Sequence, residues 1–77
     1  MRITYDPEVD AAYIYFQEAV SEVTTVCITA DLILDLGPAE KPVGVEVLSA
    51  SKHLGLSPKV TSVRVEIIGR QNRGADR

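Results

Sequence analysis

Apolar and polar residues alternate along most of the chain, and alternation with a period of two predicts β-strands that bury one face. The clearest case is residues 30–36, where every second side chain is apolar and the two aspartates would point to solvent. The same alternation marks four further runs before residue 49, at 2–5, 11–16, 23–29 and 43–48. The run at 23–29 is also rich in β-branched residues, which pack well on a pleated surface.

The pattern changes after residue 49. Ser49 and Ser51 are typical helix-capping residues, so we expect one short helix that ends near Gly55. Valine and isoleucine then recur at every second position and predict a last strand over 60–68. The polar segment 69–77 is expected to be a flexible tail.

These elements predict a mainly β (α+β) fold, a small antiparallel meander sheet of about five strands with one short helix, in a single domain over residues 1–68. A chain of 77 residues is marginally stable alone, and Cys27, the only cysteine, cannot form an internal disulfide. One short helix is too small to cover the apolar face of such a sheet. We therefore expect a second copy of the chain to cover it, giving a homodimer.

The charge is unevenly distributed. Residues 1–50 carry two basic and nine acidic residues, whereas residues 51–77 carry six basic and two acidic ones. An acidic body repels nucleic acid and suits a basic protein partner, so nucleic-acid binding is not expected. No run approaches the roughly 20 apolar residues that span a bilayer, and the N-terminus lacks an apolar signal region. With a single cysteine, these features favour the cytoplasm.

The strongest candidate for chemistry is the acidic turn, in which Asp6, Glu8 and Asp10 alternate around Pro7. We favour a structural role, in which Asp6 caps a hairpin turn and Asp10 accepts a hydrogen bond from a turn amide or a tyrosine. The alternative is a site for a hard cation, or a metal-dependent hydrolase that uses the same carboxylates. The turn lacks the glycine of a calcium-binding loop, since Ala11 stands at the sixth position. No cofactor is therefore expected.

Two further groups have weaker claims to chemistry. Ser51 and His53 lie close enough in sequence for a nucleophile and its base, but no third orienting group is in view, and we favour helix capping and a surface position. Cys27 is expected to be a small buried hydrophobic residue, because no basic neighbour in sequence would activate its thiol.

Tyr5, Tyr13 and Tyr15 can be read in two ways. Tyrosine is enriched at protein interfaces because it offers a large contact area with a polar tip. Ordinary cross-strand packing explains the same residues equally well. Gly44 is unusual inside a strand and marks either a bulge or a closely packed neighbour.

Two stretches, Tyr5–Ile14 and Val43–Ser51, closely resemble two blocks of the family known as domain of unknown function 2283. They occur in the same order and at about the same separation, and the resemblance covers roughly residues 2–55. The loop 37–42 is richer in proline than in relatives, and 60–68 extends beyond the usual end of the family. The positions that match the family pattern are Tyr5, Asp6, Glu8, Asp10, Tyr13, Gly44, Glu46 and Ser51.

The resemblance implies a small bacterial or archaeal protein of a family with no established activity, so no catalytic residues carry over. Some members are encoded beside small toxin-like proteins. We therefore expect a non-enzymatic, homodimeric protein-binding module that acts as an antitoxin-like partner of a small basic toxin. Tyr5, Asp6, Glu8, Asp10, Tyr13 and Glu46 are its candidate interaction residues. The alternative remains metal binding or metal-dependent hydrolysis at the acidic turn.

Overall fold

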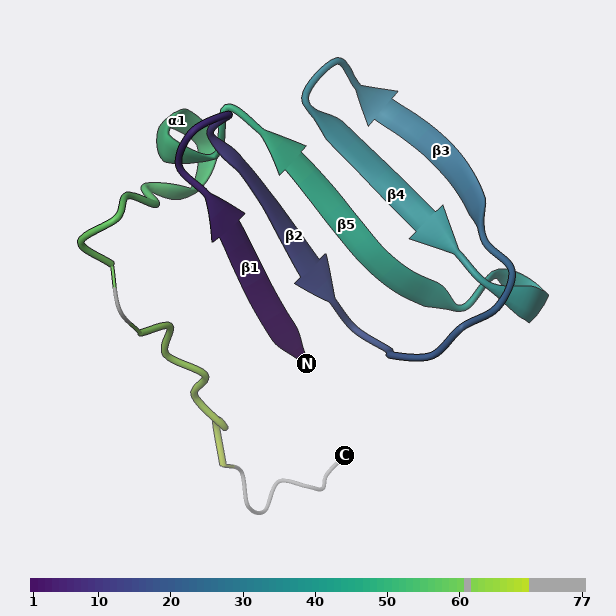
Figure 1. The fold of residues 1–77 in the computed structure, drawn as a ribbon. Helices are drawn as coiled ribbons and strands as arrows, with labels where there is room; N and C mark the ends of the chain where they lie inside the picture. Colours follow the sequence, from purple (N-terminus) through teal and green to yellow (C-terminus); the bar gives the residue numbers. More distant parts are fainter. Residues whose placement is uncertain (61, 70–77) are drawn as a thin grey trace.

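The computed structural model describes residues 1–60 and 62–69. The chain forms one five-stranded antiparallel sheet and one short α-helix, which confirms the expected fold class (Figure 1). The elements, in chain order, are β1 (Arg2–Asp6), β2 (Ala11–Tyr15), β3 (Thr24–Thr29), β4 (Leu32–Leu36), the 3₁₀ turn η1 (Pro38–Glu40), β5 (Pro42–Leu48) and α1 (Ala50–Leu54).

The strand order is β1-β2-β5-β4-β3, and this differs from the expected meander. The last strand, β5, lies in the centre between β2 and β4, while the connection 16–23 carries the chain past the sheet to its far edge (Figure 1). That connection must cover three strand spacings, about 14 Å, which a segment of this length spans easily. The result is a Greek-key order, with β3, β4 and β5 joined consecutively and β5 returned beside β2.

The strand registers separate the sheet into two faces. Ile14 pairs with Val45, which pairs on its other side with Leu34, and a parallel row runs through Val47. Because neighbouring strands point paired side chains to the same face, these rows build one apolar face. We define the open apolar face by six of its side chains, Ile3, Ile14, Val26, Leu32, Leu34 and Val45.

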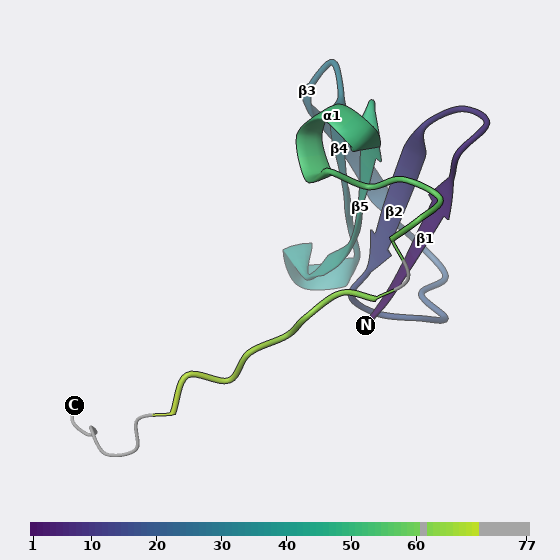
Figure 2. The same cartoon turned by 90° about the vertical axis from the view of Figure 1, so that its left-hand side faces the viewer.

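The buried core is small. Among the described residues, the hydrophobic side chains that are buried are Ala12, Val43, Val47 and Ala50, and no large side chain is fully buried. The α1 residues His53 and Leu54 line a hollow together with Leu32 and Val47, so the helix covers one end of the apolar face (Figure 2). At the β1 edge of the face, Leu56, Val60 and Val63 lie across a groove from Ile3 and Tyr5. Over the rest of that face, the described chain places no second layer.

Residues 62–69, which we call the C-terminal arm, are not a β-strand, and the strand expected over 60–68 is therefore wrong for this chain alone. A strand needs a hydrogen-bonded neighbour, and the arm leads away from the sheet (Figure 2). Beyond Gly69, the expected polar tail lies outside the described residues. No helix in the described parts of the chain is long and apolar enough to cross a membrane.

Candidate functional site

Asp10 lies at the centre of a hydrogen-bond network that joins the β1–β2 turn to α1. Its Oδ1 accepts a hydrogen bond from the Tyr5 hydroxyl at 2.7 Å and another from the backbone N–H of Ser51 at 2.9 Å. Its Oδ2 accepts from the Ser51 hydroxyl at 2.7 Å. The backbone carbonyl of Asp10 also accepts from the N–H of Ala50, at 2.9 Å. The two sequence blocks that resemble one family therefore meet in space at this residue.

This network caps the helix from outside. Ser49 occupies the N-cap position but has a left-handed backbone, φ 53°, and its side chain makes no capping hydrogen bond. Asp10 supplies the missing acceptor to the first turn, so the expectation that the local serines cap α1 needs correction. The helix ends as expected at Gly55, whose φ of 68° suits glycine.

The pKa values of the network follow from its hydrogen bonds. The Ser51 hydroxyl, and after it the Tyr5 hydroxyl, lower the pKa of Asp10, because both donate to the charged carboxylate. The same carboxylate raises the pKa of Tyr5, since it accepts a hydrogen bond from the neutral hydroxyl that ionisation would break. At neutral pH the pair is therefore an ionised aspartate held by a neutral tyrosine.

The other acidic side chains of the turn serve the turn itself. Asp6 Oδ1 accepts from the backbone N–H of Glu8 at 2.9 Å, as expected for a residue that caps a turn, and Glu8 is exposed. Asp10 instead points to Tyr5 and Ser51. Within residues 1–60 and 62–69, no group of three or more His, Cys, Asp or Glu is placed to hold a metal ion. The alternative of a cation site or hydrolase at this turn gains no support from the geometry.

A second network lies on the opposite face of the sheet. The Tyr13 ring reaches from β2 across β5 at Gly44, and its hydroxyl donates to Asp35 Oδ2 on β4 at 2.5 Å. The Thr25 hydroxyl on β3 donates to the other oxygen of Asp35 at 2.8 Å. A Cβ atom at Gly44 would lie 2.4 Å from the Tyr13 ring, so the glycine is required by a close neighbour. Four strands are linked in this way.

Burial, followed by the hydrogen bond to Asp35, raises the pKa of Tyr13 to about 12. Glu46, the cross-strand partner of Tyr13, adds a smaller effect of the same sign. The Tyr15 ring lies 4.5 Å from that of Tyr13, centroid to centroid, and Arg2 stacks over Tyr15 at 3.8 Å. These contacts favour the packing interpretation of Tyr13 and Tyr15 over the interface interpretation.

The remaining candidates do not form a catalytic group. His53 Nε2 lies 2.9 Å from Asp31 Oδ2, while Ser51 is bonded to Asp10, so the two do not act as base and nucleophile toward each other. Cys27 is exposed, which corrects the expectation that it is buried. It lies on the edge strand β3, on the face opposite Val26, which no layer covers among the residues that the structure describes.

Sequence reasoning missed Asp35 and Thr25 as members of the Tyr13 network. The alternation over residues 30–36 predicts that Asp35 lies on the polar face of the sheet, as observed, but it does not identify Tyr13 and Thr25 as its partners. Gly44 was the available signal, because a glycine inside a strand that neighbours a tyrosine-bearing strand indicates a ring lying over it. That signal becomes specific only when the pairing of β2 with β5 is known.

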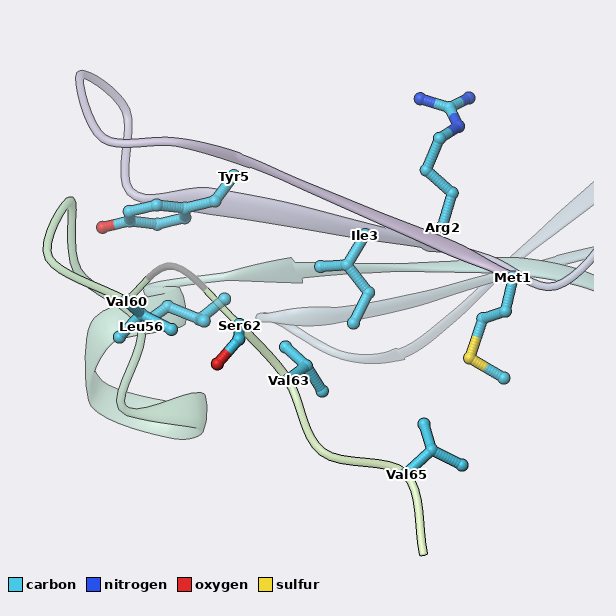
Figure 3. A pocket seen from close by; sticks show the side chains of 9 residues that line it. All are labelled: Met1, Arg2, Ile3, Tyr5, Leu56, Val60, Ser62, Val63 and Val65. Carbon is cyan, nitrogen blue, oxygen red and sulfur yellow. The ribbon is translucent and has the colours of Figure 1, made fainter.

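The surface best suited to binding is the open apolar face with the groove at its β1 edge. Ile14, Leu32, Leu34 and Val45 are only half-buried, and Val26 retains 38% exposure. At the edge, the arm and β1 enclose a groove of about 410 Å³. In Figure 3, Ile3 and Tyr5 point into it and Arg2 points the other way. The groove is lined by Met1, Arg2, Ile3, Tyr5, Leu56, Val60, Ser62, Val63 and Val65.

Comparison with known proteins identifies the family of the chain, and that family has no assigned activity. The model of the family described as "Protein of unknown function (DUF2283)" matches residues 2–51. That range holds all five strands, and it ends at Ser51, the partner of Asp10. No curated protein matches the chain, and no solved structure does.

Proposed function

Because the chain belongs to the DUF2283 family of proteins of unknown function, we propose that it is a non-enzymatic protein-binding module that acts as a homodimer through its open apolar face. The observation that carries this proposal is the lack of any fully buried large side chain among the described residues. A sheet gains most of its stability by burying one face against another layer. Here α1 lies over one end of that face and Leu56, Val60 and Val63 lie across a groove from its β1 edge, while no other part of the described chain covers the rest.

The exposed side chains are numerous enough to favour association. Fully burying one Val, Leu or Ile is worth about 1.5–3 kcal/mol relative to leaving it exposed. The half-buried Leu32, Leu34 and Val45 would each gain part of that on contact with a second copy. A two-fold pairing brings the same apolar surface from both copies together, so each copy forms the second layer over the open apolar face of the other.

Charge supports a further, basic partner. Residues 1–50, which build the whole sheet, carry nine acidic and two basic residues. Such a body attracts a basic protein and speeds the encounter with it. A small RNA-cleaving toxin is basic where it holds phosphate, and an acidic dimer would inhibit it by occupying that surface. The module would then act as an antitoxin-like partner.

Sedimentation of the full chain at micromolar concentration tests the dimer. We expect a dimer for the wild type and a monomer for Val26→Lys, because the substitution places a charge on the open apolar face. Cys27→Lys is the matched control. It adds the same charge at the neighbouring position of β3, where the side chain points to the opposite face, and this variant should remain dimeric. A single 8.4 kDa species for the wild type would overturn the proposal.

Co-expression tests the basic partner. The chain and the product of the adjacent gene are expressed together, and the complex is isolated through a tag on one of them. We expect a complex that weakens steeply with salt, since charge complementarity forms it. If the two proteins separate at low salt, the antitoxin-like role is wrong, whereas the dimer is judged by sedimentation alone.

A further inference from the structure

We propose that the C-terminal arm of one copy adds as a sixth strand to the free edge of β1 in a second copy, so that two chains exchange arms. This inference rests on the proposed dimer and names the contact that completes it. It also accounts for the strand-like sequence of a segment that is not a strand in the single chain.

The arm has the alternating sequence of a strand, and its apolar side chains are exposed to solvent. Val63, Val65 and Ile67 alternate with Arg64 and Glu66, as in a strand with one apolar and one charged face. Val65 is 78% exposed and Ile67 is 93% exposed, values that are high for apolar side chains in a folded protein. The arm also points away from the sheet that carries it (Figure 2).

The receiving edge is open. In the described structure β1 pairs only with β2, so its outer backbone N–H and C=O groups have no strand partner. An extended segment can add to such an edge through main-chain hydrogen bonds, with alternate side chains giving specificity. The groove beside β1 is lined by Met1, Ile3 and Tyr5, which match the apolar side of the arm (Figure 3).

The chain's own arm is poorly placed to fill this edge. Across the groove, Val63 faces Ile3 and Val65 faces Met1 (Figure 3). An antiparallel ladder in that register would put Arg64 directly opposite Arg2, and like charges at paired positions are destabilising. The arm of another chain is free to shift by two residues.

The shifted register removes the like-charge pair. With Ile3 opposite Val65, antiparallel pairing also sets Tyr5 opposite Val63 and Arg2 opposite Glu66. Apolar side chains then meet apolar ones on one face, while on the other Arg2 meets Glu66 and Thr4 lies opposite Arg64. A shift by a single residue would instead put charged side chains on the apolar face.

Area also favours an exchanged arm. Five strands about 4.8 Å apart, each with about five residues at 3.4 Å, present a face of about 400 Å² in projection. A standard stable interface buries about 800 Å² per partner. Two exchanged arms add to the contact made by the face, because they extend it along both β1 edges.

Engineered disulfides test the exchange directly. In a Cys27→Ser background, Ile3→Cys with Val65→Cys places thiols at paired positions of the proposed register. Both sites are partly or largely exposed, so the substitutions should be tolerated. Mild oxidation should give a species of twice the 8.4 kDa chain mass that reverts with reductant. Ile3→Cys with Arg64→Cys is the control, and its second thiol points to the other face.

Each result of the oxidation experiment either supports or overturns the exchange of arms. An interchain disulfide in the first pair and none in the control supports the exchange. A disulfide within one chain, or thiols that stay reduced, overturns it. If sedimentation still shows a dimer in that case, the arm inference fails while the proposed homodimer stands. A monomer in sedimentation rejects the proposed function itself.

A second measurement is independent of oxidation. Val65→Asp should weaken the dimer by about tenfold to a hundredfold, because it removes an apolar contact from the exchanged strand. Arg64→Asp places the same carboxylate on the polar side of the arm, opposite Thr4 in this register, and should leave the dimer constant within about threefold. Equal effects of the two substitutions would contradict the exchange.

Discussion

The carboxylate of Asp10 accepts hydrogen bonds from both the backbone N–H and the hydroxyl of Ser51, at 2.9 and 2.7 Å. The two residues are 41 positions apart, so the contact ties the first hairpin to the helix that follows the last strand. These hydrogen bonds hold together two parts of the domain that are far apart in the sequence. Four predictions follow from this contact and from the Tyr13 network on the opposite face.

Replacing Asp10 should destabilise the fold more than replacing either hydroxyl partner. Asp10→Ala removes every acceptor for Tyr5 and Ser51, and it puts alanine at a left-handed backbone position, φ 55°. Asp10→Asn keeps a capping oxygen and tolerates that backbone, so its loss should be clearly smaller. Urea unfolding midpoints measure the order. Equal midpoints for Asp10→Ala and Asp10→Asn would contradict the capping role.

Acid should weaken the domain through Asp10. The Ser51 and Tyr5 hydroxyls lower the pKa of Asp10 in the folded state, so its contribution to stability is complete above the unfolded value of about 3.9. The contribution is lost as the pH falls through the lower, folded pKa. We expect the urea midpoint of the wild type to fall more steeply below about pH 4 than that of Asp10→Asn. Parallel curves would count against the assignment.

Gly44→Ala should destabilise the sheet by about 1–3 kcal/mol, the usual range for an overpacked site. The new Cβ would meet the Tyr13 ring at 2.4 Å and push it from Asp35. Tyr13→Ala removes the obstacle, so adding Gly44→Ala to that variant should cost much less. A double-mutant cycle by urea unfolding measures this coupling. If the two losses simply add, the close contact does not govern the site.

The Tyr13 hydroxyl should ionise at an unusually high pH. Burial and the hydrogen bond to Asp35 raise its pKa to about 12, above the usual value of 10.0. A raised folded pKa means that the contribution to stability is complete below the unfolded pKa and is lost as the pH rises through about 12. Asp35→Asn should lower the Tyr13 pKa without returning it to normal, because burial remains. Phenolate absorbance, with Tyr13→Phe as the reference, follows this group.

Local patterns were sufficient to predict much of the fold. Alternation located all five strands to within two residues, and Gly55 marked the helix end. The turn role of Asp6 followed from its place before Pro7. These features depend on neighbours in sequence, where period and turn chemistry operate.

The features that could not be predicted depend on pairing between distant segments. No local pattern states that β5 enters between β2 and β4, and without that order neither Asp35 nor the need for Gly44 is visible. Asp10 and Ser51 were both singled out in the sequence, but not as partners. Val63 and Val65 lie in a segment with the alternation of a strand. A segment forms a strand only where a neighbouring strand offers hydrogen-bond partners, and the sequence does not show such a neighbour.

The most direct test of the central claim is an isotope-filtered NOE experiment on an equal mixture of carbon-13-labelled and unlabelled chains. If a second copy covers the open apolar face, the methyl groups of Val26, Leu34 and Val45 should show NOEs between chains. Should these methyl groups show NOEs only within their own chain, while the protein diffuses as a single 8.4 kDa species, the account is wrong.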